Sequence, residues 1–286
     1  MRRARRRLTS ASNTTNSGNC RRECRIHWAI CYFSGAGNTR LACEYIASRL
    51  PFSVDLIDIT VSGAVDLSGY DVVGLATYTE FSSIPRLFEA FLDSLPDQAG
   101  KRVFCVKTFG MVSAMTLPDL ASGAKRAGFE VLSGHSLRAP ESWPPMIARR
   151  LGFASQPGPS AMRRFERFVD ALPHSLDARP SLRPSFVTRP IPRSPRTKAR
   201  DDMGLKSVDA GLCTQCGRCA RECPYRAIRL EPLPVFDQES CYGCWRCYNR
   251  CPQHAIYTPR FRGGPFYSQP SEHARQVLGN VPADPS

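Results

Sequence analysis

Eight of the thirteen cysteines in this 286-residue chain fall into two copies of one spacing, which is the strongest constraint on its fold. Each copy reads Cys-x2-Cys-x2-Cys-x3-Cys-Pro. The proline that ends each copy prevents the chain from continuing as a helix at that point. Soft thiolate ligands match iron, so the pattern predicts a domain built around metal–thiolate bonds. The copies consist of Cys213, Cys216, Cys219 and Cys223, and of Cys241, Cys244, Cys247 and Cys251.

This repeated run resembles that of bacterial ferredoxins, which hold two 4Fe–4S clusters. In that family the fourth cysteine of each run ligates the cluster of the other run. The resemblance covers residues 206–262 and implies a small α+β ferredoxin-like domain. It also implies that one cluster is held by Cys213, Cys216, Cys219 and Cys251, and the other by Cys241, Cys244, Cys247 and Cys223.

Cysteines at such spacing can also bind zinc or form disulfides. A structural zinc site typically takes two separated Cys-x2-Cys pairs, and three cysteines in a row at this spacing fit it poorly. A disulfide framework belongs to small secreted domains. Here the basic start of the chain is followed by polar rather than apolar residues, unlike a secretory signal. Iron–sulfur thiolates and unpaired cysteines favour a reducing compartment, so we expect a cytoplasmic protein.

The net charge of +14 is unevenly distributed along the chain. Residues 1–25 contain eight arginines and one glutamate, whereas residues 26–172 contain equal numbers of acidic and basic residues. Such an arm is expected to be disordered, and it has no aromatic residues between its arginines, which disfavours nucleic acid as its partner. No apolar run approaches the roughly 18 residues of a membrane helix, so no membrane span is expected.

Proline and glycine divide the rest of the chain. Residues 173–205 contain six spaced prolines with scattered arginine and serine, which predicts an extended, semi-rigid linker. The linker separates residues 26–172 from the cysteine-rich residues 206–262. Residues 263–286 begin with Gly-Gly-Pro and have no periodic pattern, so they are expected to form a disordered or lightly docked C-terminal tail.

Short apolar runs alternate with helical patterns in residues 26–172, which predicts an α/β fold with a five-stranded parallel sheet. Continuous apolar runs such as Val72–Ala76 indicate strands that are buried on both faces. The expected strands are Trp28–Phe33, Ser53–Asp58, Val72–Thr77, Val103–Thr108 and Glu130–Ser136. The expected helices are Asn38–Arg49, Pro85–Leu95, Leu117–Ala127 and Ala161–Leu172.

A glycine-rich loop connects the first expected strand to the first helix. Its glycines let backbone N–H groups approach an oxyanion, and the start of the helix adds a favourable dipole. The loop has no lysine, unlike an ATP-binding loop, and lacks the third glycine of the dinucleotide pattern. It therefore predicts a phosphate site built from neutral donors. Its residues are Ser34, Gly35, Ala36, Gly37, Asn38 and Thr39.

This loop resembles the FMN phosphate loop of flavodoxins, Ser/Thr-x-Thr-Gly-x-Thr, which implies a doubly wound flavodoxin-like fold. Ser34, Gly37 and Thr39 match the family pattern, whereas Ala36 stands where the family has threonine, so one donor is missing. Flavodoxins also enclose the flavin ring with loops after the third and fourth strands. The resemblance therefore implies ring contacts from Tyr78, Thr79 and Phe81 and from Thr108, Phe109 and Gly110.

Together the two resemblances imply an electron-transfer protein that carries two 4Fe–4S clusters and FMN and passes electrons to redox protein partners. Two alternatives remain open at this point. One is a flavin-dependent reductase of a quinone or another acceptor, for which Glu80 is the only suggestive carboxylate. The other is a redox-sensing or regulatory protein that uses the arginine-rich arm.

Overall fold

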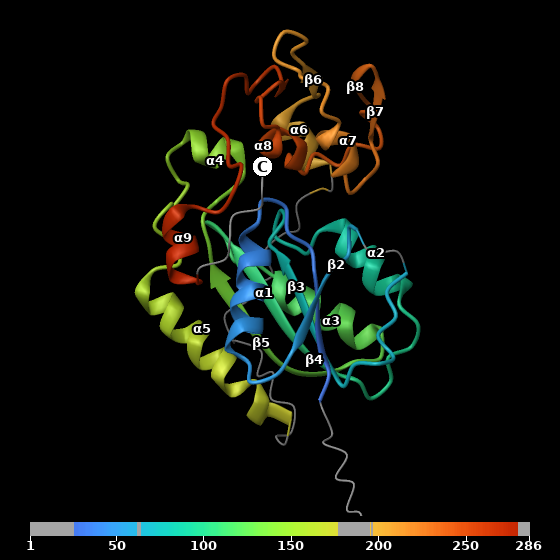
Figure 1. Ribbon diagram of the computed structural model, residues 1–286, viewed down its shortest axis with the longest axis vertical. Helices are drawn as coiled ribbons and strands as arrows, with labels where there is room; N and C mark the ends of the chain where they lie inside the picture. Colours follow the sequence, from blue (N-terminus) through green and yellow to red (C-terminus); the bar gives the residue numbers. More distant parts are fainter. Residues whose placement is uncertain (1–25, 62–63, 177–194, 196, 280–286) are drawn as a thin grey trace, which may run out of the picture.

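Five parallel strands form one sheet in the order β2-β1-β3-β4-β5 (Figure 1). The computed structural model describes residues 26–61, 64–176, 195 and 197–279. The central strands β1 and β3 are buried almost along their whole length, as expected when helices cover both faces. This strand order defines the flavodoxin-like form of the doubly wound fold. The strands are β1 (Trp28–Tyr32), β2 (Val54–Asp58), β3 (Val72–Tyr78), β4 (Arg102–Phe109) and β5 (Glu130–Arg138).

Helices pack on both faces of the sheet and build a hydrophobic core on each. One core contains residues of α1 (Asn38–Arg49) and α5 (Pro159–Ala171). The other contains residues of α2 (Arg86–Ser94) and α3 (Thr116–Arg126). A short helix, α4 (Pro144–Ala148), follows β5. The 3-10 turn η1 (Pro173–Leu176) follows α5.

The predicted α/β fold and all nine of its expected elements are confirmed, with ends within two residues of the prediction. The largest differences have physical causes. Strand β5 extends to Arg138 because it stays paired with β4 as far as Phe109. Helix α5 begins at Pro159, since proline suits the first helical position, where its missing N–H group has no intrahelical partner.

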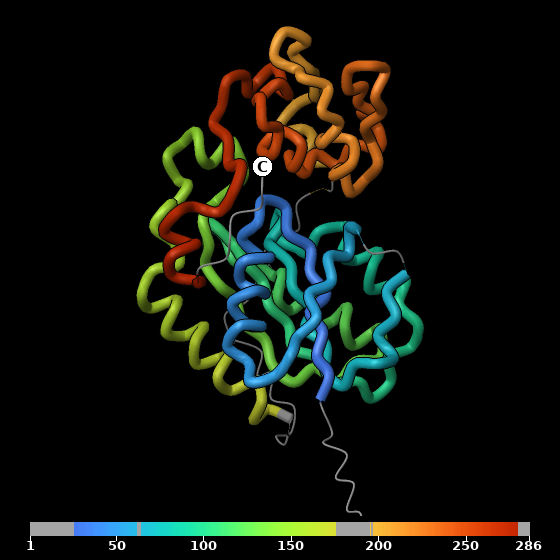
Figure 2. Tube along the Cα trace, in the orientation of Figure 1, coloured from blue at the N-terminus to red at the C-terminus, as the bar shows by residue number. Residues whose placement is uncertain are grey.

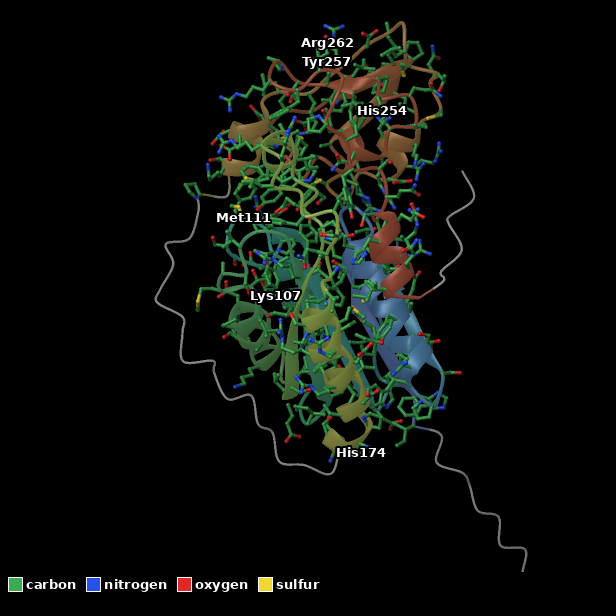
Figure 3. The ribbon with its side chains drawn as sticks, turned by 90° about the vertical axis from the view of Figure 1, so that its left-hand side faces the viewer. Lys107, Met111, His174, His254, Tyr257 and Arg262 are labelled. Atoms are coloured by element: carbon green, nitrogen blue, oxygen red, sulfur yellow. The ribbon has the colours of Figure 1, made fainter. Side chains whose placement is uncertain are left out.

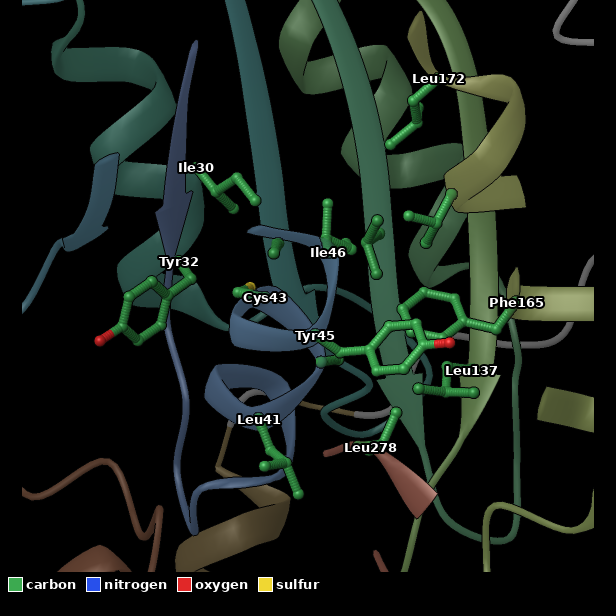
Figure 4. Packing of buried hydrophobic residues seen from close by; sticks show 14 of the residues in the cluster. Ile30, Tyr32, Leu41, Cys43, Tyr45, Ile46, Leu137, Phe165, Leu172 and Leu278 are labelled. Atoms are coloured by element: carbon green, nitrogen blue, oxygen red, sulfur yellow. The ribbon is translucent and has the colours of Figure 1, made fainter. Parts of the chain in front are cut away.

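Aromatic rings fill the core between the sheet and helices α1 and α5 (Figure 4). Tyr45 of α1 stacks on Phe165 of α5 with ring centroids 5.4 Å apart. His135 of β5 lies against the same layer, 5.3 Å from Phe165 and 5.1 Å from Phe168. Leu278, from the far C-terminal end of the described chain, is buried in this core as well.

The packing of His135 predicts a loss of stability in acid. Burial lowers the pKa of His135 to about 4, and Arg164 adds to this. An unfolded histidine titrates near 6.5, so this contribution is present above that pH and is lost as the pH falls towards 4. We expect the free energy of unfolding to fall by about 2 kcal/mol from this group between pH 7 and pH 5. Urea denaturation followed by circular dichroism at both pH values measures it.

His135→Phe keeps an aromatic ring in this layer and removes the titrating group. This variant should lose about 2 kcal/mol less than the parent protein over the same pH interval. An equal pH dependence in the His135 variant and the parent would contradict the assignment.

The cysteine-rich part, residues 206–262, is a small α+β unit, as the sequence predicts. Strand β6 (Ser207–Val208) pairs antiparallel with β9 (Ile256–Tyr257), and β7 (Ile228–Glu231) pairs with β8 (Leu233–Phe236). Each copy of the cysteine run supplies one short helix between its strands. These helices are α7 (Arg218–Arg221) and α8 (Arg246–Arg250).

Two segments differ from their sequence-based description. Residues 198–203 of the predicted linker form helix α6 (Lys198–Met203), whose Ala199 and Met203 are buried in the core of the cysteine-rich part. Residues 173–176 of the same predicted linker form the 3-10 turn η1. Linker residues 177–194 and 196, like the basic arm 1–25, lie outside the described residues. In the C-terminal tail, α9 (Glu272–Val277) is capped by the Ser271 side chain, which accepts a hydrogen bond from the N–H of Ala274.

The tail connects the two parts of the molecule. Figure 2 shows its red trace leaving the cysteine-rich part and running along the side of the sheet part to α9. Ala274 and Leu278 are buried in the core that also contains α1 and α5. Of the two expectations for this tail, disordered or lightly docked, the described residues show the docked one. The sequence did not predict the helix, because six residues leave no periodic signal. Among the described residues, no helix is long and apolar enough to cross a membrane.

Candidate functional site

The structure brings together Cys213, Cys216, Cys219 and Cys251, which we call the first quartet, around one cavity. Its empty volume is about 380 Å³. Cys216 is exposed, whereas the other three thiols are partly buried. Cys251 arrives from the second copy of the sequence run, and its sulfur accepts a hydrogen bond of 3.3 Å from the N–H of Ala255. The first three cysteines and their distant fourth therefore surround a common space.

Cys241, Cys244, Cys247 and Cys223, the second quartet, surround another cavity, of about 300 Å³. The sulfur of Cys223 accepts a hydrogen bond of 3.4 Å from the N–H of Ala227, which repeats the arrangement at Cys251. Burial raises the pKa of Cys244 to about 12 and raises that of Cys247 as well. Ionisation of these thiols therefore depends on a strong positive centre in the cavity, as metal coordination provides.

Each of the two cavities is lined by four cysteines, three from one copy of the run and the fourth from the other copy. A structural zinc site typically takes two separated Cys-x2-Cys pairs, whereas a crossing fourth cysteine is the arrangement of ferredoxin-type 4Fe–4S clusters.

Two buried cations line the cavity of the second quartet. Lys206 is 3% exposed, and its Nζ lies 3.5 Å from the sulfur of Cys241. Burial acts to lower the pKa of Lys206, but the thiolates of Cys247, Cys241 and Cys244 oppose it and the result is a raised pKa. Arg246 is 7% exposed, and its Nε lies 4.0 Å from Glu222. Lys206 was not identified from the sequence, because it lies in no recognisable pattern, whereas Arg246 stands within the second cysteine run.

A third cavity lies at the carboxyl ends of β1, β3, β4 and β5, and we call it the strand-end pocket. Its empty volume is about 480 Å³, part of it open to solvent. Doubly wound proteins bind their ligands at this edge of the sheet. Of the predicted flavin contacts, the pocket is lined by Ser34, Gly35, Ala36, Asn38, Thr39, Tyr78, Thr79, Thr108, Phe109 and Gly110.

The loop at the start of α1 has the features of an anion site. Gly37 precedes the helix with φ of 102°, a conformation that favours glycine, and no side chain caps the helix. The first N–H groups of α1 have no intrahelical partners. The hydroxyl of Ser34 accepts a hydrogen bond from the N–H of Gly37, and the hydroxyls of Thr39 and Thr108 lie 2.8 Å apart. These contacts join the loop to the end of β4.

Asn38 differs from its expected role as a donor to phosphate. Its side-chain amide donates to the carbonyl of Pro140, and its side-chain oxygen accepts a hydrogen bond of 2.7 Å from Tyr267. Pro270 of the same tail packs against Gly37, where an added Cβ would lie 2.8 Å from the proline ring. The side chain of Asn38 thus fixes the C-terminal tail over the loop, and the phosphate donors that remain are backbone and hydroxyl groups.

A buried lysine holds the loop after β4 through hydrogen bonds to its backbone carbonyls. Lys107 donates hydrogen bonds to the carbonyls of Ser113 and Ala114, and burial lowers its pKa to about 8. Figure 3 labels Lys107, on β4, and Met111, in the loop that follows β4. Both lie well apart from Tyr257 and Arg262 in the cysteine-rich part. Because Lys107 points away from the pocket lining, we assign it a structural role.

Glu141, in the loop after β5, is a lining residue of the strand-end pocket that sequence reasoning missed. Its carboxylate accepts hydrogen bonds from the N–H groups of Met111, Ser142 and Trp143. A Cβ added to Gly110 would lie 2.3 Å from this carboxylate. The close approach requires glycine at position 110. Glu141 could have been predicted from its position just after the last strand, because loops at the carboxyl ends of the strands face the ligand in this fold.

Phe81 lies elsewhere than predicted. It packs against Trp143 and Trp245, with ring centroids 5.3 Å and 6.1 Å away, and does not line the strand-end pocket. The three rings belong to the core that holds the two parts of the molecule together. Asn249 of α8 adds a hydrogen bond of 3.0 Å to the carbonyl of Ser142. The loop after β3 therefore turns its phenylalanine towards the cysteine-rich part rather than into the pocket.

Trp245 replaces a glycine of the first cysteine run. It occupies the position that Gly217 has in the first copy, and both adopt a left-handed backbone, with φ of 46° and 71°. A side chain in this conformation costs roughly 1–2 kcal/mol. The cost is offset here by the burial of the indole, which is 8% exposed and lines the strand-end pocket. The tryptophan thus connects the second quartet to that pocket.

Cys244 lines both the strand-end pocket and the cavity of the second quartet. The two spaces are therefore separated by one residue. The first quartet shares no lining residue with the pocket. Glu80, the carboxylate considered for a reductase, is 2% exposed in this region and does not line the pocket. Its carboxylate accepts a hydrogen bond of 3.4 Å from the hydroxyl of Tyr78, which does line the pocket.

Comparison with known proteins gives a family match for the cysteine-rich part and similar solved structures for the sheet part. Residues 212–255 match the family described as the 4Fe-4S dicluster domain. No curated protein matches the chain. A flavodoxin from the domain Archaea is 15% identical, covers 53% of this chain and 99% of its own length, and has a TM-score of 0.39. Flavodoxin 2 from Bacillus cereus is 19% identical, with coverage of 52% and 98% and a TM-score of 0.42.

At these scores the assignment of the sheet part to the flavodoxin-like fold rests on its own strand order. A flavodoxin-like sheet combined with a 4Fe-4S dicluster domain supports a role in electron transfer. The predicted combination of these two classes of domain in one chain is confirmed.

Proposed function

We propose that this protein is an electron carrier that binds two 4Fe–4S clusters and FMN and exchanges electrons with redox protein partners. When bound, the clusters exchange single electrons, and the flavin accepts one or two. The observation that carries the proposal is the position of Cys244, which lines both the cavity of the second quartet and the strand-end pocket. The two quartets would each hold one cluster.

The quartets would have different roles because their surroundings differ. The first quartet contains the exposed Cys216, so it is the one that a partner protein reaches. The second quartet shares Cys244 with the lining of the strand-end pocket, whereas the first quartet shares no residue with it. Cys244 and Trp245 would lie between the cluster of the second quartet and a ligand in that pocket.

The lining of the strand-end pocket supports FMN as its ligand. The loop from Ser34 to Thr39 would hold the phosphate through backbone N–H groups and hydroxyls. Tyr78, Phe109 and Trp245 supply aromatic surfaces for a planar ring system.

The proposal is tested on protein that is purified and reconstituted without oxygen. Iron, acid-labile sulfide and flavin are counted, and optical and EPR spectra are recorded. We expect about eight irons and eight sulfides for each chain, from two 4Fe–4S clusters, with one bound FMN. Colourless protein that contains zinc would reject the clusters. Protein with clusters that neither contains nor binds FMN would reject the flavin.

Ala36 predicts how the affinity for FMN can be increased. Ala36 lines the pocket and is 7% exposed, at the position where flavodoxins have threonine. Ala36→Thr should restore one hydroxyl donor to the phosphate and tighten FMN binding by about 1 kcal/mol, or roughly fivefold. Quenching of flavin fluorescence during titration measures the affinity. Ala36→Val has the same shape without a hydroxyl and should show no gain; equal gains would show that packing alone is responsible.

A further inference from the structure

Lys206 is held rigidly beside the second quartet. It lies between α6 and β6, and its backbone N–H and carbonyl are both hydrogen bonded to the side chain of Gln238, at 3.3 Å and 2.8 Å. Its side chain is 3% exposed and directs Nζ to the sulfur of Cys241 at 3.5 Å. The backbone hydrogen bonds fix the position of the Lys206 Cα, and the side chain is almost fully shielded from solvent.

The charges around the two cavities differ. The cavity of the second quartet is lined by Lys206 and Arg246, and no carboxylate lines it. The cavity of the first quartet is lined by one cation, Arg218, which is 35% exposed and pairs with Glu222 at 2.7 Å. A buried cation is screened much less than an exposed, paired one. The second quartet therefore experiences the stronger positive field from its own lining.

We infer that Lys206 raises the reduction potential of the cluster held by the second quartet, the one beside the strand-end pocket. The inference rests on the proposed function. Uptake of one electron adds negative charge to a cluster, and hydrogen bonds to its sulfurs and nearby charge set its potential. A positive group that donates to a ligand sulfur stabilises the reduced state. Lys206 would thus stabilise the reduced form of the cluster that lies next to the strand-end pocket.

The test is a redox titration of the reconstituted full-length protein, with dithionite as the electron donor and EPR as the readout. Lys206→Met removes both the charge and the donor. We expect one of the two cluster potentials to fall by at least about 59 mV, which is a tenfold change in the ratio of reduced to oxidised cluster. The other potential should not move. Lys206→Arg keeps the charge, so its cluster potential should stay close to that of the parent protein.

Lys198→Met is the matched control. Lys198 lies on the neighbouring α6, 43% exposed and paired with Asp202, so its removal should leave both potentials unchanged. Full iron and sulfide content with unchanged potentials in Lys206→Met would overturn the inference and leave the proposed function intact. Parent protein without clusters would instead reject the proposed function.

A second variant decides the case in which Lys206→Met does not assemble both clusters. Lys206→Gln retains an N–H donor and removes the charge. It should still lower one potential, by less than Lys206→Met. If Lys206→Gln also fails to hold the second cluster, Lys206 is needed for assembly rather than for the potential, and the inference is rejected.

Discussion

Replacement of Cys244 by alanine is expected to halve the iron and sulfide content and to disconnect the flavin from the remaining cluster. Cys244 lines the cavity of the second quartet, and a 4Fe–4S cluster needs one thiolate for each iron. It also lines the strand-end pocket, so no other quartet residue takes its place there. Metal analysis and EPR measure the loss of the cluster. The electron transfer between cluster and flavin is measured by stopped-flow, as the rate at which a reduced ferredoxin reduces the flavin. In the Cys244 variant this rate should fall to the rate measured for protein without clusters.

Cys216→Ala provides the comparison, because Cys216 belongs to the first quartet and is exposed. This variant should lose a similar amount of iron but keep the EPR signal of the cluster beside the pocket. The two variants should therefore differ in which cluster signal survives. Cys105→Ala, which removes a buried core thiol outside both quartets, should keep both clusters. Full iron content in the Cys244 variant would show that the second quartet is assigned wrongly.

The sheet was predictable because the relevant signals are local. Continuous apolar runs such as Val72–Ala76 mark a strand that is buried on both faces, and the structure has β3 there. Glycines after the first run mark the turn into α1. The resemblance of the cysteine spacing to that of bacterial ferredoxins implied which thiols are grouped, and the same two sets of four line the two cavities. The two short helices of the runs were not predicted.

The contacts between the two parts were not predictable in the same way. Phe81 looked like a ring contact because it follows β3, but its direction depends on Trp143 and Trp245, which come from distant segments. Asn38 looked like a phosphate donor, but Tyr267 of the tail occupies its side-chain oxygen. Such pairings are decided by packing between segments far apart in sequence, for which a single sequence has no periodic signal.

The junction also explains why the second cysteine run departs from the first. Where the first copy has Gly217, the second has Trp245 in the same left-handed conformation. A lone ferredoxin-like unit would have no reason to bear the backbone strain of a tryptophan there. In this chain the indole packs on Phe81 and Trp143 of the sheet part and lines the strand-end pocket. The strain is thus compensated by the contact between the two parts.

Gly110→Ala is expected to weaken FMN binding with little change in the clusters. A Cβ at this position would lie 2.3 Å from the Glu141 carboxylate and 3.0 Å from its Cβ. Glu141 would have to move, and its hydrogen bonds to the N–H groups of Met111, Ser142 and Trp143 would weaken. Overpacking of this kind costs about 1–3 kcal/mol. The free protein can relax this loop whereas bound FMN holds it in place, so the dissociation constant should rise by up to roughly 150-fold. Flavin fluorescence titration measures it.

Gly69→Ala is the matched control for this change, because a Cβ at Gly69 meets no atom within 4 Å. It should leave FMN binding unchanged. Iron content, sulfide content and the EPR spectrum should be the same in both variants, since Gly110 lines the strand-end pocket and neither quartet cavity. If Gly110→Ala bound FMN as tightly as Gly69→Ala, the flavin ring would not lie against the loop after β4. Ligand binding at this edge of the sheet would then have to be assigned to other residues.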